Sequence, residues 1–176
     1  LNRLYHVAWL YMNQGEYEKA ALWSHRLAEG AQASDNARYT TIARLNLLQM
    51  AYQNGDAAAA PEIRRISQTE TDWFARVHAM RLVAVHMIDA GRIGDALKHL
   101  ADAEALIPSN DPYADTARAG VWEFVGVALM SLNDVSGAAA AFGRFEIDYN
   151  DPAYPRPDFD SLFNLASLAI MTGDQR

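Results

Sequence analysis

The chain has 176 residues, of which 51% are hydrophobic, and it carries 15 Lys and Arg against 22 Asp and Glu, a formal net charge of −7. An acidic chain argues against sequence-independent nucleic-acid binding, which depends on neutralising phosphates, and no basic amphipathic segment suits an anionic membrane surface. The absence of cysteine excludes disulfides and thiolate metal sites, and no apolar run approaches the roughly 20 residues of a membrane-spanning helix.

The first two predicted helices form a hairpin around Gly15. Residues 1–13 form the first helix, and Gly15 ends it because glycine adopts the left-handed conformation of a helix end at little cost. The second helix covers residues 16–29, and Gly30 is predicted to end it for the same reason. We expect the two helices to pack against each other as an antiparallel pair.

The next hairpin has its turn at Gly55. Ser34 and Asp35 are capping residues, and they predict a helix from there to about residue 53. After the turn, Pro61 is tolerated only in the first turn of a helix. The fourth helix is therefore predicted to begin late, near this proline.

A long fifth helix and a shorter sixth helix follow. Thr69 or Thr71 is predicted to cap the fifth, which runs through Ala90. The sixth lies within residues 91–108, where five apolar residues at spacings of three and four share one face until Pro108 ends the helix. These five residues are Ala96, Leu97, Leu100, Ala103 and Leu106.

The last complete hairpin begins at residues 110–112, Asn-Asp-Pro, where a capping side chain precedes a proline suited to the first helical turn. Its first helix is predicted to run to Leu132 and its second to cover residues 136–149. Residues 150–157 contain three prolines and connect to a further predicted helix. No stretch alternates apolar and polar residues as strands do, so the predicted fold is all-α.

The turn signals recur at positions 15, 55, 91, 133 and 173, at steps of 40, 36, 42 and 40 residues, and an alanine stands five residues after each of the first four. Such a step is typical of a solenoid, in which each unit buries its apolar face only against its neighbours. We therefore predict one repeat domain over residues 1–176. Its units are 1–34, 35–70, 71–110, 111–150 and a partial 151–176. Because the chain starts without Met and ends just after a turn, we expect it to be a fragment of a longer protein.

Two of these units carry residues at the intervals of a known repeat. The third has Ala84, Ala96, Leu100, Ala103 and Pro108, and the fourth has Trp122, Gly126, Leu129, Ala138 and Phe142. In this respect the chain resembles the tetratricopeptide repeat family. The resemblance implies a TPR-like α-solenoid, in which antiparallel pairs of A and B helices form a right-handed superhelix. It also implies that Gly126 lies where two helices approach closely, and that Trp122 lies in the core.

The same resemblance implies a concave groove, lined by the A helices, that accepts a peptide or a protein partner. The groove residues carried over are Tyr5, Trp9, Asn13, Gln49, Gln53, His78, Arg81 and Glu123. Tyr5 and Trp9 lie one helical turn apart, so their rings share a face. The alternative is that a missing part of a longer protein covers these two residues as core. They also stand where a groove that clamps a terminal carboxylate needs lysine and asparagine, so that function is not implied.

No pattern of residues predicts a catalytic, cofactor or metal site. His78 and His86 lie eight residues apart, about 12 Å along a helix axis, which is too far for one ion. Residues 91–94 lack the glycines and the preceding strand of a phosphate-binding loop, and no serine lies in a nucleophile-elbow pattern. The chain is therefore expected to be a non-catalytic binding module without cofactors.

The step between repeats and the stretch 154–166, YPRPDFDSLFNLA, resemble the repeat regions of bacterial signalling proteins, such as a diguanylate cyclase with a GGDEF output domain. The resemblance implies a sensory or interaction region, which is periplasmic in a membrane-anchored sensor. The alternatives are the ligand- or partner-binding region of a cytoplasmic transcription regulator and an assembly scaffold. The compartment, the identity of the partner and the formation of a homodimer stay open.

Overall fold

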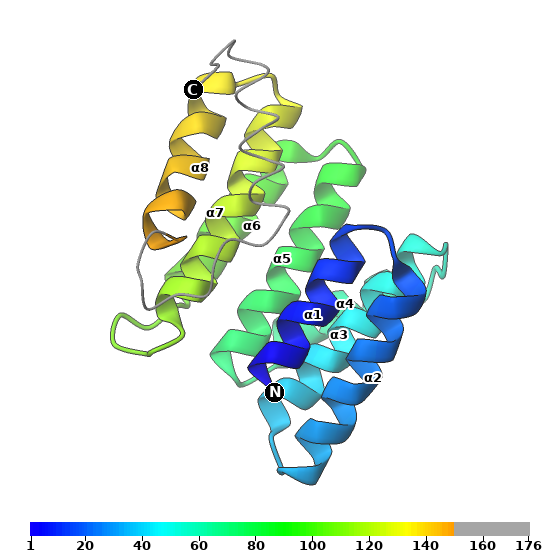
Figure 1. Ribbon diagram of the computed structural model, residues 1–176. Coiled ribbons are helices and arrows are strands. Elements are labelled where there is room, and N and C mark those ends of the chain that lie inside the picture. Colours follow the sequence, from blue (N-terminus) through cyan, green and yellow to red (C-terminus); the bar gives the residue numbers. More distant parts are fainter. Residues whose placement is uncertain (150–176) are drawn as a thin grey trace. The chain divides into compact units, whose positions relative to one another are not determined.

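The computed structural model describes residues 1–149, and it describes the side chains of all of these except Asn13 and residues 145–149. Helices account for 80% of the described residues and none of them forms a strand, which confirms the all-α prediction. The helices are α1 (Asn2–Asn13), α2 (Tyr17–Ala33), α3 (Ala37–Gln53), α4 (Ala59–Thr69), α5 (Trp73–Asp89), α6 (Ile93–Ala105), α7 (Ala114–Ser131) and α8 (Val135–Tyr149) (Figure 1).

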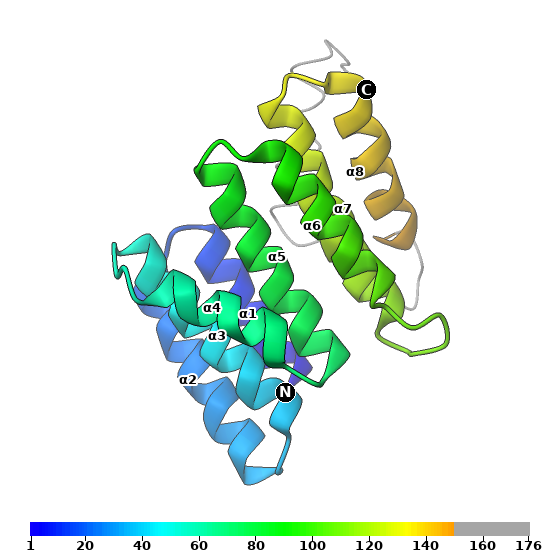
Figure 2. The same ribbon diagram turned by 180° about the vertical axis from the view of Figure 1, so that it is seen from behind.

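The chain divides into two compact units, and the boundary, after Val83, falls within α5. In the first unit, α1 packs along α2, α2 along α3, and α3 against α4, while α1 also contacts α3 (Figures 1 and 2). In the second unit, α6 contacts α7, and α7 packs along α8. The prediction of one continuous repeat domain stays a prediction.

Four of the five predicted turns share one backbone conformation. Gly15, Gly55, Gly91 and Asn133 have φ of 71°, 86°, 73° and 58°, in the left-handed region that ends many helices. At the first turn, the N–H of Gly15 donates to the carbonyl of Met12, three residues before it. The N–H of Glu16 donates to the carbonyl of Tyr11, five residues before it. The same pair of bonds recurs at the other three turns. The turn predictions are therefore confirmed within residues 1–149, and the fifth turn, at Gly173, lies outside them together with the predicted connection and helix after Tyr149.

The prediction that Gly30 ends the second helix is wrong, because α2 continues to Ala33. The left-handed residue is instead Asp35, with φ of 50°. Gly30 has a packing role: a Cβ added there would lie 3.0 Å from Cδ2 of Leu1. Glycine thus gives room for the first residues of the chain to lie close to α2.

The caps predicted for the third and fifth helices are also corrected. Asn36, rather than Ser34 or Asp35, caps α3, with its Oδ1 accepting a hydrogen bond from Tyr39 N–H at 3.1 Å. Asp72, rather than Thr69 or Thr71, caps α5, and its Oδ1 accepts from Ala75 N–H at 2.9 Å. In both cases the helix begins one to three residues later than predicted, and the residue next to it provides the cap.

The late start of the fourth helix agrees with expectation, whereas the seventh helix begins at Ala114, after the start predicted at residues 110–112, and no side chain caps it. Helix α4 begins at Ala59, so Pro61 lies in its first turn, where no backbone N–H is needed. Before it, Asp56 Oδ1 accepts from Ala58 N–H at 2.9 Å. Asp111 Oδ1 likewise accepts from Tyr113 N–H at 2.9 Å, just ahead of α7.

The core of the second unit lies between α7 and α8. Phe142 and Ala138 of α8 are buried, with Val127 and Met130 of α7 packed against them. A Cβ added at Gly126 would lie only 2.5 Å from Cε1 of Phe142, so the ring occupies the space that any other residue would fill. The prediction that Gly126 lets two helices approach closely is confirmed.

Trp122 departs from its predicted place in the core. The residue is half-buried, and its Nε1–H donates to Oε1 of Glu104 at 3.0 Å. The guanidinium carbon of Arg144 lies 4.0 Å from the centroid of the same residue's ring. An indole can be both apolar and a hydrogen-bond donor, and here it links α6, α7 and α8 at the edge of the core.

Candidate functional site

Most residues predicted to line a groove are buried, which differs from the expectation of an open wall. The exposed fraction of six of them is 2–6%: Tyr5, Trp9, Gln49, His78, Arg81 and Glu123. Gln53 is exposed at the end of α3, and the side chain of Asn13 lies outside the described part. In the first unit, the faces of the A helices that were predicted to line a groove are therefore packed against other helices.

Tyr5 and Trp9 of α1 pack on α5. The centroid of the His78 ring lies 5.7 Å from that of Tyr5 and 5.5 Å from that of Trp9, with interplanar angles of 81° and 65°. These are edge-to-face contacts, which suit the charge distribution of aromatic rings. The guanidinium carbon of Arg81 lies 5.2 Å from the Trp9 ring centroid, a cation–π contact. The structure thus brings four predicted site residues together.

Helix α3 adds a residue that the sequence analysis did not select. Oδ1 of Asn46 accepts a hydrogen bond from Nε2 of His78 at 3.2 Å, and the two side chains are 1% and 2% exposed. The available signal was a single asparagine within an otherwise apolar run, LNLL, at residues 45–48. We name Tyr5, Trp9, Asn46, His78 and Arg81 the polar cluster.

The interior holds His78 in its neutral form. Burial is the main cause that lowers its pKa from 6.5 to about 3, and the positive charge of Arg81 is the second cause. Because the Asn46 oxygen can only accept, Nε2 carries the proton and Nδ1 presents a lone pair. At neutral pH the ring is therefore one donor and one acceptor.

The hydrogen-bonded pair His78 and Asn46 contains two atoms that make no hydrogen bond to any described residue. They are Nδ1 of His78, an acceptor, and Nδ2 of Asn46, a donor. A buried polar atom left in this state costs about 1–3 kcal/mol, and natural proteins contain few of them. The cluster therefore contains unused hydrogen-bonding capacity of both kinds.

Polar contacts around the cluster tie α3 to the segment that enters α5. The guanidinium of Arg38 bonds both carboxylate oxygens of Asp72, at 2.9 and 3.0 Å. The hydroxyl of Thr41 donates to Oε2 of Glu70 at 3.0 Å. Together with the Asn46–His78 bond, these contacts hold α3 and α5 in a fixed register.

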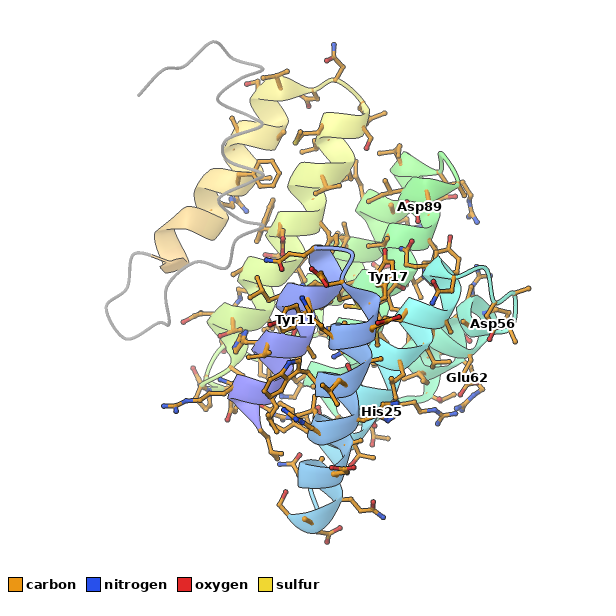
Figure 3. The ribbon with its side chains drawn as sticks, turned by 45° about the vertical axis from the view of Figure 1, so that its right-hand side comes forward. Tyr11, Tyr17, His25, Asp56, Glu62 and Asp89 are labelled. Atoms are coloured by element: carbon orange, nitrogen blue, oxygen red, sulfur yellow. The ribbon has the colours of Figure 1, made fainter. Side chains whose placement is uncertain are left out.

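A second charged group lies on α4. Glu62, labelled in Figure 3, belongs to α4. Its carboxylate accepts hydrogen bonds from Arg65 on the same helix and from Arg44 on α3. The hydrogen bond from Arg65 is the main cause that lowers the pKa of Glu62 to about 2. This group is on the surface, where ion pairs contribute little to stability. It connects α4 to α3 and does not form a candidate site.

The described residues do not form a metal centre. Among residues 1–149, no three His, Asp or Glu side chains lie close enough together to hold a metal ion. Nor does this part of the chain contain a helix long and apolar enough to cross a membrane. The chain matches no protein-family model, no curated protein and no solved structure. What the polar cluster offers is recognition chemistry: two aromatic rings, a guanidinium, one donor and one acceptor.

Proposed function

We propose that the chain is a helical-repeat module that binds a protein or peptide through the face of α1, α3 and α5. The observation that carries this proposal is the meeting of Tyr5, Trp9 and Arg81 in one cluster. Tyrosine, tryptophan and arginine dominate the binding energy of protein interfaces, because each combines a large contact area with a polar end. In this proposal the chain has no catalytic role.

We further propose that the helix pairs form a TPR-like solenoid with a right-handed superhelix. Two observations support it. The A helices begin at Asn2, Ala37, Trp73 and Ala114, at nearly constant intervals. The turn with a left-handed residue recurs between the two helices of each pair. Pairs of similar length joined in the same way stack readily on one another.

The biological setting that we propose is the sensory or interaction region of a bacterial signalling protein. The support is the step between turns and the stretch at residues 154–166. A membrane-spanning helix and a cyclase or kinase domain in the flanking sequence would favour this setting. A helix-turn-helix there would instead point to a transcription regulator.

The binding proposal is tested by selecting helical peptides from a display library on the immobilised protein. The affinity of the selected peptides is then measured by fluorescence anisotropy for the wild type, Arg81→Ala and Arg26→Ala. The two arginines are matched, since each lies on a tryptophan ring, at 5.2 Å in one case and 4.5 Å in the other. We expect Arg81→Ala to raise Kd about tenfold or more and Arg26→Ala, on the exposed side of α2, to leave it unchanged. Equal effects of the two, in variants that circular dichroism shows to be folded, would refute the proposed face.

A further inference from the structure

The outer face of α2 carries a large aliphatic side chain in the middle of a charged stripe. Among the side chains that the structure describes, four large hydrophobic ones are exposed. Three of them belong to the capping residues at helix ends, Leu106, Tyr113 and Leu132. The fourth, Leu22, is 50% exposed and lies inside α2, where a helix of a globular protein usually has polar residues on its solvent side.

Two exposed charged residues flank Leu22 on the same face. Glu18 lies four residues before it and Arg26 four residues after it, which places each about 6 Å away along the helix axis and about 40° to one side. The guanidinium carbon of Arg26 lies 4.5 Å from the centroid of the Trp23 ring, a contact that fixes the position of this charge. The opposite face of α2 is packed, and its buried residues are Ala20, Ser24, Leu27 and Ala31.

The order of these residues along α2 suits a second copy of the same helix. In a twofold contact centred on Leu22, the two helices run antiparallel, and each residue faces the one that is equally far on the other side of Leu22. The two leucines then meet, and Glu18 of each copy lies over Arg26 of the other. Within one helix Glu18 and Arg26 are about 12 Å apart, too far to pair with each other, so their charges complement each other only between copies.

The remaining exposed residues of the stripe are compatible with this register. Lys19 faces His25, and Glu29 faces Gly15, so no two like charges meet when histidine is counted as neutral. A register shifted by one residue would instead place Lys19 opposite Arg26, and like charges across an interface are costly. The charge pattern therefore favours the arrangement that brings the two leucines together.

We propose that the outer face of α2 is a docking surface for a second copy of this chain, with Leu22 on the twofold axis and a Glu18–Arg26 ion pair on either side of it. A single exposed leucine is common on protein surfaces. What selects the occupant is the complementary charge around it. The face lies on α2, whereas the proposed binding face lies on α1, α3 and α5, so this inference goes beyond the proposed function and does not depend on it.

The dimer is expected to be weak. A contact made by one helix of each copy buries less than the roughly 1,200 Å² of a standard interface. Ion pairs at the rim of such a contact contribute little energy and mainly fix the register. We expect a dissociation constant on the order of 100 µM.

Sedimentation equilibrium of the chain at concentrations up to about 1 mM covers this range. The average mass of the wild type is expected to rise with concentration toward that of a dimer. Leu22→Asp places two carboxylates against each other on the twofold axis and is expected to stay monomeric. The matched control is Leu132→Asp, at a leucine that is 54% exposed in the turn after α7, and it should associate as the wild type does. Circular dichroism checks that both variants are folded.

Charge reversal tests the register without changing the leucine. Glu18→Arg and Arg26→Glu each bring like charges together at two places, so each is expected to raise the dissociation constant at least tenfold. The chain with both reversals regains opposite charges and should associate as the wild type does. An equimolar mixture of the two single variants should form mixed dimers, because one has two arginines at these positions and the other two glutamates. Lys98→Glu, at an exposed position on α6, is the control and should have no effect.

Three results would overturn the proposal: a wild type that is monomeric at every concentration, equal loss of association in Leu132→Asp and Leu22→Asp, or a double reversal that fails to restore association. A monomeric wild type whose library-selected peptides lose affinity with Leu22→Asp would assign the α2 face to a different protein, and it too would overturn the proposal. The proposed function fails separately, since the effect of Arg81→Ala on peptide affinity is measured at protein concentrations well below those at which the dimer forms.

Discussion

Two helix contacts, α1 on α5 in the first unit and α8 on α7 in the second, show two ways in which helices pack together. In the second unit, the Phe142 ring fills the space that the absent side chain of Gly126 leaves. In the first, two aromatic rings cover a histidine that is hydrogen-bonded to a buried asparagine. The turns before α6 and α8 and after α1 and α3 have the same conformation. The turn therefore does not decide the kind of contact.

The difference teaches what each contact contributes. Close apolar packing gains dispersion and burial without leaving a polar atom unsatisfied, so it mainly stabilises. A buried polar group contributes less net stability and restricts which partner surface fits, because every unsatisfied atom is costly. We expect substitutions in the second unit to change stability most, and those in the first to change pH dependence and binding.

The largest effect is expected at Phe142, which is fully buried. Phe142→Ala leaves a cavity against α7 and should lower the free energy of unfolding by about 3–5 kcal/mol. Urea unfolding followed by circular dichroism measures it. Tyr113→Ala, at an exposed position before α7, is the control and should change stability by less than about 0.5 kcal/mol. A similarly small change at Phe142 would show that the α7–α8 contact does not govern the stability of this unit.

The second-largest effect is expected at Gly126 and tests whether the close approach of α7 and α8 causes the stability of this contact. Gly126→Ala places a methyl group 2.5 Å from the Phe142 ring, and the strain should cost about 1–3 kcal/mol. The matched control is Gly143→Ala in α8, where an added Cβ meets nothing within 4 Å, so higher helix propensity should stabilise by up to about 1 kcal/mol. We expect thermal melts to show a lower melting temperature for Gly126→Ala and a higher one for Gly143→Ala. Adding Phe142→Leu, which places a smaller side chain next to position 126, should relieve part of the cost of Gly126→Ala. Equal signs would refute the close approach.

The polar cluster is expected to make stability depend on pH. The folded pKa of His78, about 3, lies below the unfolded value of 6.5, so the unfolded chain binds a proton that the folded chain excludes. Stability from this residue is complete above pH 6.5 and is lost as pH falls toward 3. Between pH 7 and pH 5 the loss should be about 2 kcal/mol relative to His78→Gln, which does not titrate.

Urea unfolding at the two pH values measures this loss. The control is His25→Gln, at an exposed position on α2 (Figure 3), and it should keep the wild-type profile. If His78→Gln kept that profile as well, protonation of His78 would not be coupled to folding, and the contrast between the two units would be lost.

The smallest effect is expected at Trp122, at the edge of the apolar contact. Trp122→Phe removes the N–H group that bonds Glu104 and keeps an aromatic ring under Arg144. The loss should be about 0.5–1.5 kcal/mol, the usual net contribution of one hydrogen bond. Trp23→Phe, whose ring also carries an arginine, controls for ring size. A Trp122 effect as large as that of Phe142→Ala would place Trp122 in the core after all.

The two corrected caps and Gly30 show where local patterns failed in the fold. Several capping residues follow one another before α3 and α5, and the one that acts depends on where the helix can begin against its neighbours. Gly30 looked like a helix end because glycine is common there. Its role is to let Leu1 approach α2, a contact between residues far apart in the chain.

The candidate site was predictable in part of its membership and not in its exposure. Helical spacing places Tyr5 and Trp9 on one face, and the repeat resemblance relates that face to His78 and Arg81. Periodicity does not state what covers a face. Here α5 covers it, so residues expected on an open wall are buried. Asn46 was missed because its hydrogen-bond partner, His78, lies 32 residues away in the sequence.

The sequence by itself determined the helices and the turns at Gly15, Gly55, Gly91 and Asn133, because a left-handed residue and its two hydrogen bonds involve only a few consecutive residues. The tertiary structure alone decided which polar side chains the interior would hold. Asn46 and His78 become neighbours only when α3 and α5 pack, and the low polarity of that contact, rather than the residue type, keeps the histidine neutral.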